Sequence, residues 1–230
     1  MEMKDRIAVV RDKIEKAAVS CGRRAEDITL VAASKQNGAD AVCLAKSCGI
    51  SVFGENRVQE LLEKKAQGAY DGAEIRLIGH LQQNKVNKIV GACDIIESVD
   101  SISLMRRISD RALLLGIRQD ILIEVNIAGE AQKSGISPAE ADDIFSSAAD
   151  CRGIFLKGLM AIPPADASER EKYNYFDAMR KLYVDMRAKK YDNSDVCILS
   201  MGMSRDYETA ILAGSNTVRV GTAIFGPRNY

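Results

Sequence analysis

The chain has 230 residues, of which 47% are hydrophobic, so it is long enough to bury a sizeable core in one or two domains. Its 32 basic and 32 acidic side chains cancel in charge, and aromatic residues make up only 5%, with no Trp. This composition argues against a nucleic-acid partner and against a polybasic surface that binds membranes.

Residues 1–20 predict a helix that precedes the first strand. Charges run through this segment, so it is neither a signal peptide nor a transit peptide, and the chain has no run of about 18 apolar residues that could span a membrane. The absence of a CxxC pair and the single histidine, His80, disfavour a zinc site. We expect most of the cysteines to be free and buried, and the protein to be cytoplasmic. The cysteines are Cys21, Cys43, Cys48, Cys93, Cys151 and Cys197.

Strand-like runs then recur along the chain, with helical patterns between them. Two of the clearer helices span residues 137–148, where Ser137 and Pro138 open the helix, and residues 167–190. Eight strands that alternate with helices predict an α/β fold, a closed (β/α)8 TIM barrel with an extra N-terminal helix, and an open doubly wound sheet is the alternative. No linker divides the chain, so we expect residues 1–230 to form a single domain. The predicted strands cover residues 28–34, 51–56, 74–80, 94–100, 120–128, 154–162, 196–202 and 217–226.

In a barrel of this kind, the side chains that follow the strands converge on one mouth, where they carry the chemistry. The first strand ends in Ser34 and Lys35, with no turn residue between the apolar run and the amine. A lysine in this position often extends into solvent, but it can also form a Schiff base with a carbonyl group. For that reaction the pKa of Lys35 must fall from about 10.4, through burial or through neighbouring cations.

Two motifs near the C-terminus predict a site for an anion. The motif SMGMS supplies two hydroxyls and a glycine, and the motif RVGTA supplies a glycine, a hydroxyl and the amides of a turn. Loops after the seventh and eighth strands of a barrel often hold phosphate, although these glycines could instead serve only tight turns. The residues concerned are Ser200, Gly202, Ser204, Gly221 and Thr222.

Arg219 alternates with Val218 and Val220, so its side chain points either into the barrel or to its outside. An inward arginine is costly without a partner. A ring nitrogen of a heteroaromatic ligand could be that partner, and so could a strand carboxylate such as Glu124.

Three other polar features have simpler interpretations. His80 ends a strand with no evident partner, which favours a rim or core histidine over an acid–base group. Asn126 lies between apolar neighbours and reads equally well as a core polar group with its hydrogen bonds made. The run Glu63, Lys64 and Lys65 is typical of a solvated helix face.

Seven motifs together carry a family resemblance, and they run in order along nearly the whole chain. The chain resembles the pyridoxal-phosphate homeostasis proteins, which are single-domain relatives of the alanine racemase barrel. The motifs are LVAASKQ (30–36), FGENRVQE (53–60), IGHLQQNK (78–85), EVNIAGEAQKSGI (124–136), GLMAIPP (158–164), LSMGMSRDYETAI (199–211) and VRVGTAIFGPRNY (218–230).

This resemblance implies that the cofactor is pyridoxal 5'-phosphate (PLP), held as a reversible Schiff base on Lys35. Asn56 would lie beside the ring, and Arg219 would face the pyridine nitrogen. Because an arginine does not give up its proton, the ring would stay mostly unprotonated and would be a weak electron sink. One departure is visible, since Arg57 stands where the family commonly has Tyr.

The same resemblance implies that four residues of the two glycine-containing motifs hold the phosphate group of PLP. They are Ser200, Gly202, Gly221 and Thr222.

Racemases of this barrel type take a second base from a domain beyond the barrel, whereas this sequence ends at Tyr230, just after the eighth strand. Lys35 is then the one credible base, so we expect a PLP carrier rather than an enzyme. PLP-dependent apoenzymes are candidate recipients, and we expect a monomer or a weak homo-oligomer. The alternatives are a low-activity PLP-dependent amino-acid racemase and a cofactor-free Schiff-base aldolase that acts on a sugar phosphate.

Overall fold

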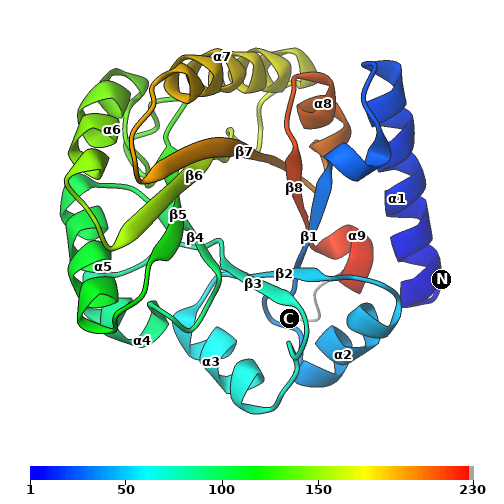
Figure 1. The fold of residues 1–230 in the computed structure, drawn as a ribbon. Coiled ribbons are helices and arrows are strands. Elements are labelled where there is room, and N and C mark those ends of the chain that lie inside the picture. Colours follow the sequence, from blue (N-terminus) through cyan, green and yellow to red (C-terminus); the bar gives the residue numbers. More distant parts are fainter. Residues whose placement is uncertain (228–230) are drawn as a thin grey trace.

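The computed structural model describes residues 1–227, and the end of the last family motif, residues 228–230, lies outside the described residues. Eight parallel strands form a closed barrel in sequence order, which confirms the predicted (β/α)8 fold (Figure 1). The ring closes between the first and last strands, where Val31 lies opposite Arg219. The strands are β1 (Thr29–Ala33), β2 (Val52–Glu55), β3 (Glu74–Leu77), β4 (Ile95–Val99), β5 (Gln119–Val125), β6 (Ile154–Ala161), β7 (Ser194–Met203) and β8 (Thr217–Val220).

The helices form an outer layer around this ring, and the predicted helix over residues 167–190 is found as α7, which Ser168 caps at its first turn. Three short 3-10 helices span Ala25–Asp27, Gln83–Lys85 and Pro138–Glu140. The α-helices of the described residues are α1 (Met3–Ser20), α2 (Ala39–Ser47), α3 (Val58–Ala66), α4 (Val86–Ile89), α5 (Ile102–Leu114), α6 (Ala141–Ala149), α7 (Glu169–Ala188), α8 (Tyr207–Leu212) and α9 (Thr222–Phe225).

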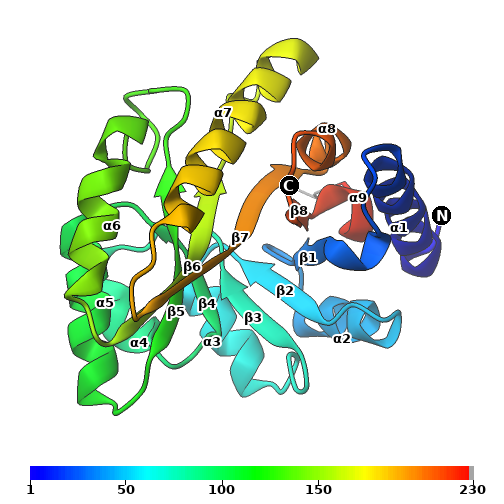
Figure 2. The ribbon, with the colours of Figure 1, turned by 45° about the horizontal axis from the view of Figure 1, so that its top comes forward.

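Helix α1 lies on the outside of the barrel, next to the short helix α9. It buries one face, with Ile7, Val10 and Ile14 spaced as a helical stripe, and it packs beside α8 and α9 (Figure 2). The predicted extra N-terminal helix is therefore part of the barrel's outer layer. Among residues 1–227, no helix is both long enough and apolar enough to cross a membrane.

Three strands end at least three residues earlier than the sequence predicts: β3, expected over residues 74–80, ends at Leu77, and β5 and β8 are also shorter. The expected strand over residues 217–226 ends at Val220, because Gly221 accepts the amide hydrogen bonds that open α9. The expected strand over residues 120–128 ends at Val125, because the Asn126 side chain bonds the backbone of the following loop. Because these strands are short, loops form more of the end of the barrel that follows them.

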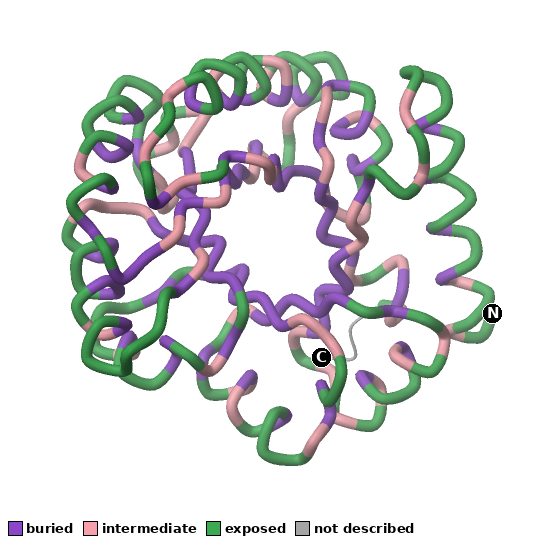
Figure 3. Tube along the Cα trace, in the orientation of Figure 1, coloured by how far each residue is buried: buried purple, intermediate pink, exposed green. Residues whose placement is uncertain are grey.

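The barrel wall is buried, and the exposed residues lie mainly on the outer helices (Figure 3). Ile95, Leu122 and Met160 form a small apolar cluster that is separate from the main core. Glu97 lies two positions after Ile95 on β4, and Glu124 lies two positions after Leu122 on β5. Because alternate residues of a strand share a face, an apolar layer inside the barrel lies beneath a polar layer nearer the mouth.

The cysteines are less buried than the sequence predicts, although none of the six forms a disulfide in the described part of the chain. Only Cys93 and Cys151 are buried, whereas Cys21 and Cys43 are exposed at the end of α1 and on α2. Small and apolar residues beside a cysteine in the sequence did not predict its burial, because a helix places some of its apolar residues on the outer face.

Candidate functional site

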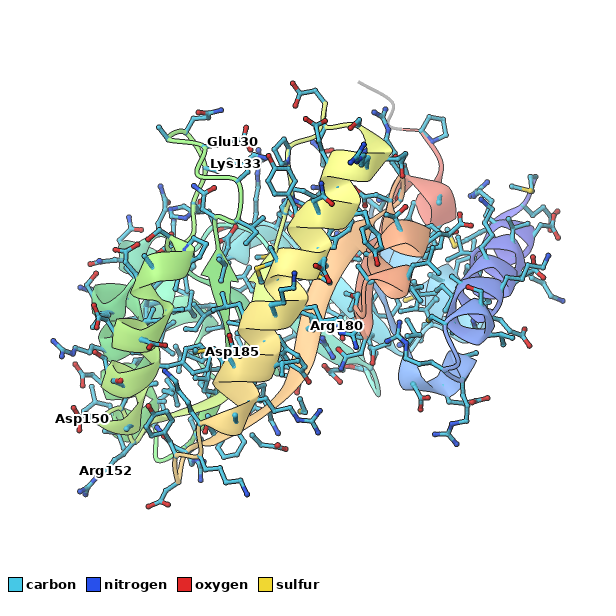
Figure 4. All side chains as sticks on the ribbon, turned by 90° about the horizontal axis from the view of Figure 1, so that it is seen from above. Glu130, Lys133, Asp150, Arg152, Arg180 and Asp185 are labelled. Carbon is cyan, nitrogen blue, oxygen red and sulfur yellow. The ribbon has the colours of Figure 1, made fainter. Side chains whose placement is uncertain are left out.

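The carboxyl ends of the eight strands converge on one end of the barrel. Figure 4 shows Glu130 and Lys133, in the loop after β5, at that end, where they form an ion pair. Asp150 and Arg152, which precede β6, lie at the opposite end. Because all strands are parallel, the residues that follow each strand gather at the Glu130 end, which we call the mouth.

Lys35 lies at the mouth, two residues beyond the end of β1, and it is half-buried. The carbonyl of Lys35 accepts a hydrogen bond of 3.0 Å from the Asn37 side chain. Its strand is packed tightly against the turn after β8, because a Cβ atom added to Gly221 would lie 3.2 Å from the carbonyl oxygen of Ala33. The amine-bearing loop and the predicted phosphate turn are therefore neighbours.

Asn56 follows β2 and is also half-buried. Its backbone is in close contact with Gly79, since a Cβ atom on Gly79 would lie 2.4 Å from the carbonyl oxygen of Asn56. Only a glycine permits this approach between the ends of two neighbouring strands. Arg57, the departure from the family pattern, is exposed and precedes the first turn of α3.

The turn after β8 is tied to the end of β7 by Ser204. The Ser204 hydroxyl oxygen accepts hydrogen bonds from the amides of Gly221 at 3.0 Å and Ala223 at 3.4 Å. A serine hydroxyl also has one proton to donate, so Ser204 can still bond an anion at the mouth. Thr222, the first residue of α9, is exposed beside it.

Gly202 serves the packing of β7 on α8. Its φ is +92°, and an added Cβ atom would lie 2.9 Å from Cα of Tyr207 and 2.6 Å from Cβ of Ala210. Gly202 lies within β7, where the register shifts between Ser200 and Met203, so its positive φ and close packing serve an irregular strand and not a tight turn, and its phosphate role stays a prediction.

Beneath the mouth, a buried polar chain crosses the barrel interior, and we call it the polar floor. Arg219 donates to the Ser200 hydroxyl at 2.5 Å and to the Ala161 carbonyl at 3.0 Å. Ser200 donates to Glu97 at 2.6 Å, and the other oxygen of Glu97 accepts from Arg76 at 3.0 Å. Burial lowers the pKa of Arg219, while Glu97 opposes that effect.

Two of the predicted cofactor-binding residues belong to this floor. Ser200 is fully buried and donates its hydroxyl proton to Glu97, so its side chain supports the floor, and its part in phosphate binding stays a prediction. Arg219 points inward, and the strand carboxylate that it meets, with a separation of 3.7 Å, belongs to Glu97 and not to Glu124.

Glu124 is a second acid–base group inside the barrel. It is 9% exposed, and its Oε2 atom is buried with no hydrogen-bond partner among the described residues. Burial, and then the charge of Asp100, raise the pKa of Glu124 to about 7, although Arg219 and His80 act in the opposite direction. Glu124 can therefore exchange a proton near neutral pH.

His80 and Asn126 shape the rim. His80 Nδ1 lies 3.1 Å from a carboxylate oxygen of Asp100, a partner that the sequence did not reveal, and 3.4 Å from the Ser134 hydroxyl. The Asn126 side chain donates to the Glu130 carbonyl at 2.8 Å and accepts from the Glu130 amide at 3.1 Å. Asn126 thus has its hydrogen bonds made, as expected, and it holds the loop that borders the mouth.

One prediction about a charged residue was wrong. Lys64, expected on a solvated helix face together with Glu63 and Lys65, is only 5% exposed and forms ion pairs with Glu55 and Glu60. A lysine on a helix has the same local sequence pattern whether it faces solvent or a buried carboxylate, so the residue was missed.

The groups at the mouth suit a small molecule that carries both an aldehyde and a phosphate. Lys35 provides a half-buried amine, and the turn at Gly221 has no Cβ atom that would fill the space beside Ala33. Ser204 offers a donor for an anion, and the unpartnered oxygen of Glu124 offers a buried acceptor below. These residues fit PLP.

Comparisons with known proteins identify the family of this chain. The model of the family "Alanine racemase, N-terminal domain" matches residues 9–229. The chain is 40% identical over 227 residues to the pyridoxal phosphate homeostasis protein of Escherichia coli strain K12, which covers 97% of this chain and 96% of that protein. It is 37% identical to the protein of the same name from Aquifex aeolicus, which covers 98% of both chains.

Solved structures give the same result. PipY of Synechococcus elongatus with PLP bound superimposes with a TM-score of 0.85 at 29% identity, covering 98% of this chain and all of PipY. An alanine racemase of Clostridium difficile shares the fold, with a TM-score of 0.69 at 18% identity, and this chain spans 60% of its length. With a match that extends over almost all of its length, the chain belongs to the pyridoxal phosphate homeostasis protein family, whose barrel is that of the alanine racemase N-terminal domain.

Proposed function

We propose that residues 1–230 form a single PLP-binding domain that holds the cofactor as a reversible Schiff base on Lys35 and releases it to other proteins. The observation that carries the proposal is the position of Lys35, half-buried at the mouth beside the turn at Gly221. The PLP-bound structure of PipY and the names of the full-length relatives support it.

PLP supplies an aldehyde that an amine can capture and release without any net redox change. Lys35 is the amine of this chain, and Asn56 would lie beside the ring. Gly221 and Thr222 would bind the phosphate together with Ser204 and with the segment that precedes it, which contains Ser200 and Gly202.

The polar floor would orient the ring from below. Arg219 is fixed by Ser200 and by the Ala161 carbonyl, so its guanidinium cannot move far from its place under the mouth. A fixed and protonated arginine below a pyridine nitrogen disfavours protonation of that nitrogen, which weakens the ring as an electron sink. This feature suits a carrier better than a catalyst.

Glu124 is the observation that keeps a second candidate, a low-activity PLP-dependent amino-acid racemase. A racemase needs two groups that exchange protons, and Lys35 and Glu124 are two such groups within one barrel. Exchange of the α-proton of alanine in deuterated water, measured with the PLP-loaded protein, separates the candidates. We expect a rate no greater than that of free PLP, and a clearly higher rate would favour the racemase.

Three accompanying proposals concern the recipients of PLP, the cell compartment and the oligomeric state. PLP-dependent apoenzymes are the recipients that this chemistry fits, because their own lysine amine can accept the aldehyde. A reducing cytoplasm suits six cysteines that form no disulfide in the described part of the chain, and we propose a monomer or a weak homo-oligomer.

The test is to add PLP to the purified protein, record the absorbance spectrum, reduce with borohydride and locate the modified lysine by mass spectrometry. We expect a visible Schiff-base band, loss of that band on reduction, and a phosphopyridoxyl group on Lys35. Absence of the band, or a label confined to another lysine such as Lys85, would overturn the proposal. If borohydride instead links a sugar phosphate to the protein in the absence of PLP, the result would favour an aldolase.

A further inference from the structure

Lys64 is a buried lysine on the outer side of the barrel wall, where α3 packs on β2. Its Nζ atom donates to three acceptors: the Ser34 carbonyl at 2.9 Å, Glu55 at 2.6 Å and Glu60 at 2.7 Å. An amine nitrogen has three protons to donate, so the three bonds use its full capacity. Such complete bonding defines the position of Lys64 closely.

Glu55 joins this lysine to the barrel wall. Its Oε1 atom accepts from the Ser34 hydroxyl at 2.6 Å and from the Tyr70 hydroxyl at 2.8 Å, as well as from Lys64. Burial raises the pKa of Glu55, and the bonds from Lys64 and Ser34 oppose this effect. Three donors thus hold Glu55 in place, and the pair that it forms with Lys64 does not depend on Glu60.

Glu60 connects the cluster to Gln36, the residue that follows Lys35. Its Oε1 atom accepts from the Gln36 amide at 2.5 Å and also from Lys64. Gln36 has a φ of +65°, which no other non-glycine residue of the described part of the chain matches on the positive side. A side chain other than glycine rarely holds this conformation unless its surroundings fix it, and the bond to Glu60 does so.

The bonds of this cluster converge on the residues on either side of Lys35. The Ser34 carbonyl is held by Lys64, and the Gln36 amide is held by Glu60. These two backbone groups set the direction in which Lys35 leaves the chain. Lys64 meets its three partners on the outer side of the barrel wall, so the cluster acts on the loop from behind.

A second buried lysine provides a comparison. Lys172 on α7 is 7% exposed and pairs with Glu169 at 3.3 Å, and Glu169 also accepts from Thr209. These contacts stabilise the helical layer and touch no residue next to Lys35. Lys172 is thus a buried lysine with an exposed partner and a purely structural role, which differs from the arrangement around Lys64.

We propose that Glu60 and Lys64 are positioning residues that fix the backbone on both sides of Lys35 and thereby set how long the protein retains PLP. This inference rests on the proposed function, since it concerns the amine that captures the cofactor. A loop held in advance loses little conformational freedom when its lysine binds, whereas a loosened loop loses more and releases its ligand sooner.

The test compares Glu60→Ala with Glu60→Gln in the full chain. Alanine removes the acceptor for the Gln36 amide while Glu55 still pairs with Lys64, so the fold should persist. Glutamine keeps a carbonyl oxygen at the same distance along the side chain. The readouts are the PLP dissociation constant from absorbance titration and the rate of PLP release into an excess of a trapping amine.

We expect Glu60→Ala to release PLP about tenfold faster and Glu60→Gln to stay within about twofold of the unmodified protein, because preorganisation is restored with the acceptor. Glu169→Ala is the matched control, since it removes the partner of the other buried lysine, and it should leave release unchanged. Thermal unfolding without PLP shows whether each variant is folded under the conditions of the assay.

The outcomes separate this inference from the proposed function. If the unmodified protein forms no Schiff-base band, the proposed function fails first. If it binds PLP while Glu60→Ala releases it at the unmodified rate, or if Glu169→Ala accelerates release equally, only the positioning role is overturned. An equal increase in the PLP release rate for Glu60→Gln and Glu60→Ala would also contradict the positioning role, because the hydrogen bond to Gln36 would then not be the cause.

Discussion

Arg219 donates a hydrogen bond of 2.5 Å to the hydroxyl of Ser200, and that hydroxyl donates its own hydrogen bond of 2.6 Å to Glu97. The serine, on β7, thus joins the buried cation of Arg219 on the neighbouring strand β8 to the buried carboxylate of Glu97 on β4, across the barrel. Charges in such surroundings are tolerated only when paired and hydrogen-bonded, so Ser200 belongs to the stability of the barrel as much as to the site above it.

Replacing Ser200 with Ala should lower the free energy of unfolding by about 1–3 kcal/mol, because Glu97 and Arg219 each lose a buried partner. Urea unfolding followed by circular dichroism measures this change. Ser204→Ala is the control, since Ser204 is only half-buried, and it should cost less. A larger loss for Ser204→Ala than for Ser200→Ala would show that the polar floor does not depend on this hydroxyl.

Lys35→Ala should abolish the visible band that PLP produces, because no amine remains at that point of the mouth. We expect the free energy of unfolding to change by less than about 1 kcal/mol, since Lys35 is half-buried and is not part of the core. Absorbance titration and urea unfolding test the two statements. Lys85→Ala, at another half-buried lysine that follows a barrel strand, should keep the band. Retention of the band by Lys35→Ala would move the attachment point elsewhere.

The pH dependence of stability should report on Glu124. Its pKa is about 7 in the folded protein and about 4.5 when unfolded, so folding favours the protonated form. Stability from this group is therefore present below pH 4.5 and is lost as the pH rises towards 7, with a total of about 3 kcal/mol. Glu124→Gln should remove this loss and make the protein more stable at pH 8 than the unmodified chain.

Urea unfolding at pH 5 and pH 8 measures that difference for each protein. Glu63→Gln, at an exposed position on α3, is the control and should follow the unmodified protein at both pH values. If Glu124→Gln shows the same fall in stability between the two pH values as the unmodified chain, another group causes the fall.

Gly202→Ala should be strongly destabilising, by more than about 2 kcal/mol, because it combines a positive φ with a collision. An added Cβ atom would meet backbone of α8, with Cα of Tyr207 at 2.9 Å. Gly221→Ala has a negative φ and a milder contact of 3.2 Å with Ala33, so its effect should be smaller. Melting temperatures measured without PLP rank the two variants. The reverse order would show that the turn after β8 is the more restricted of the two.

Much of the fold could be predicted because it depends on local patterns. Apolar runs that alternate with amphipathic helices indicate parallel strands, and their number favours a closed barrel. The position of Lys35 followed from the same reasoning, since a residue just after a barrel strand must lie at the mouth. The motif around Gly221 was found in the same way. The early end of β8 was missed because Ala223, Ile224 and Phe225 resume the apolar run after Gly221 and Thr222.

The sequence by itself therefore determined the barrel, the mouth and the amine placed there, because strand periodicity and chain order need no long-range contact to be recognised. The tertiary structure alone decided which charges are buried and with whom: Lys64 with Glu55 behind the Lys35 loop, and Arg219 with Glu97 beneath it. A charged residue in a helix or strand has the same local pattern in water or in a core. Only the approach of segments far apart in the chain removes the water and supplies the partner.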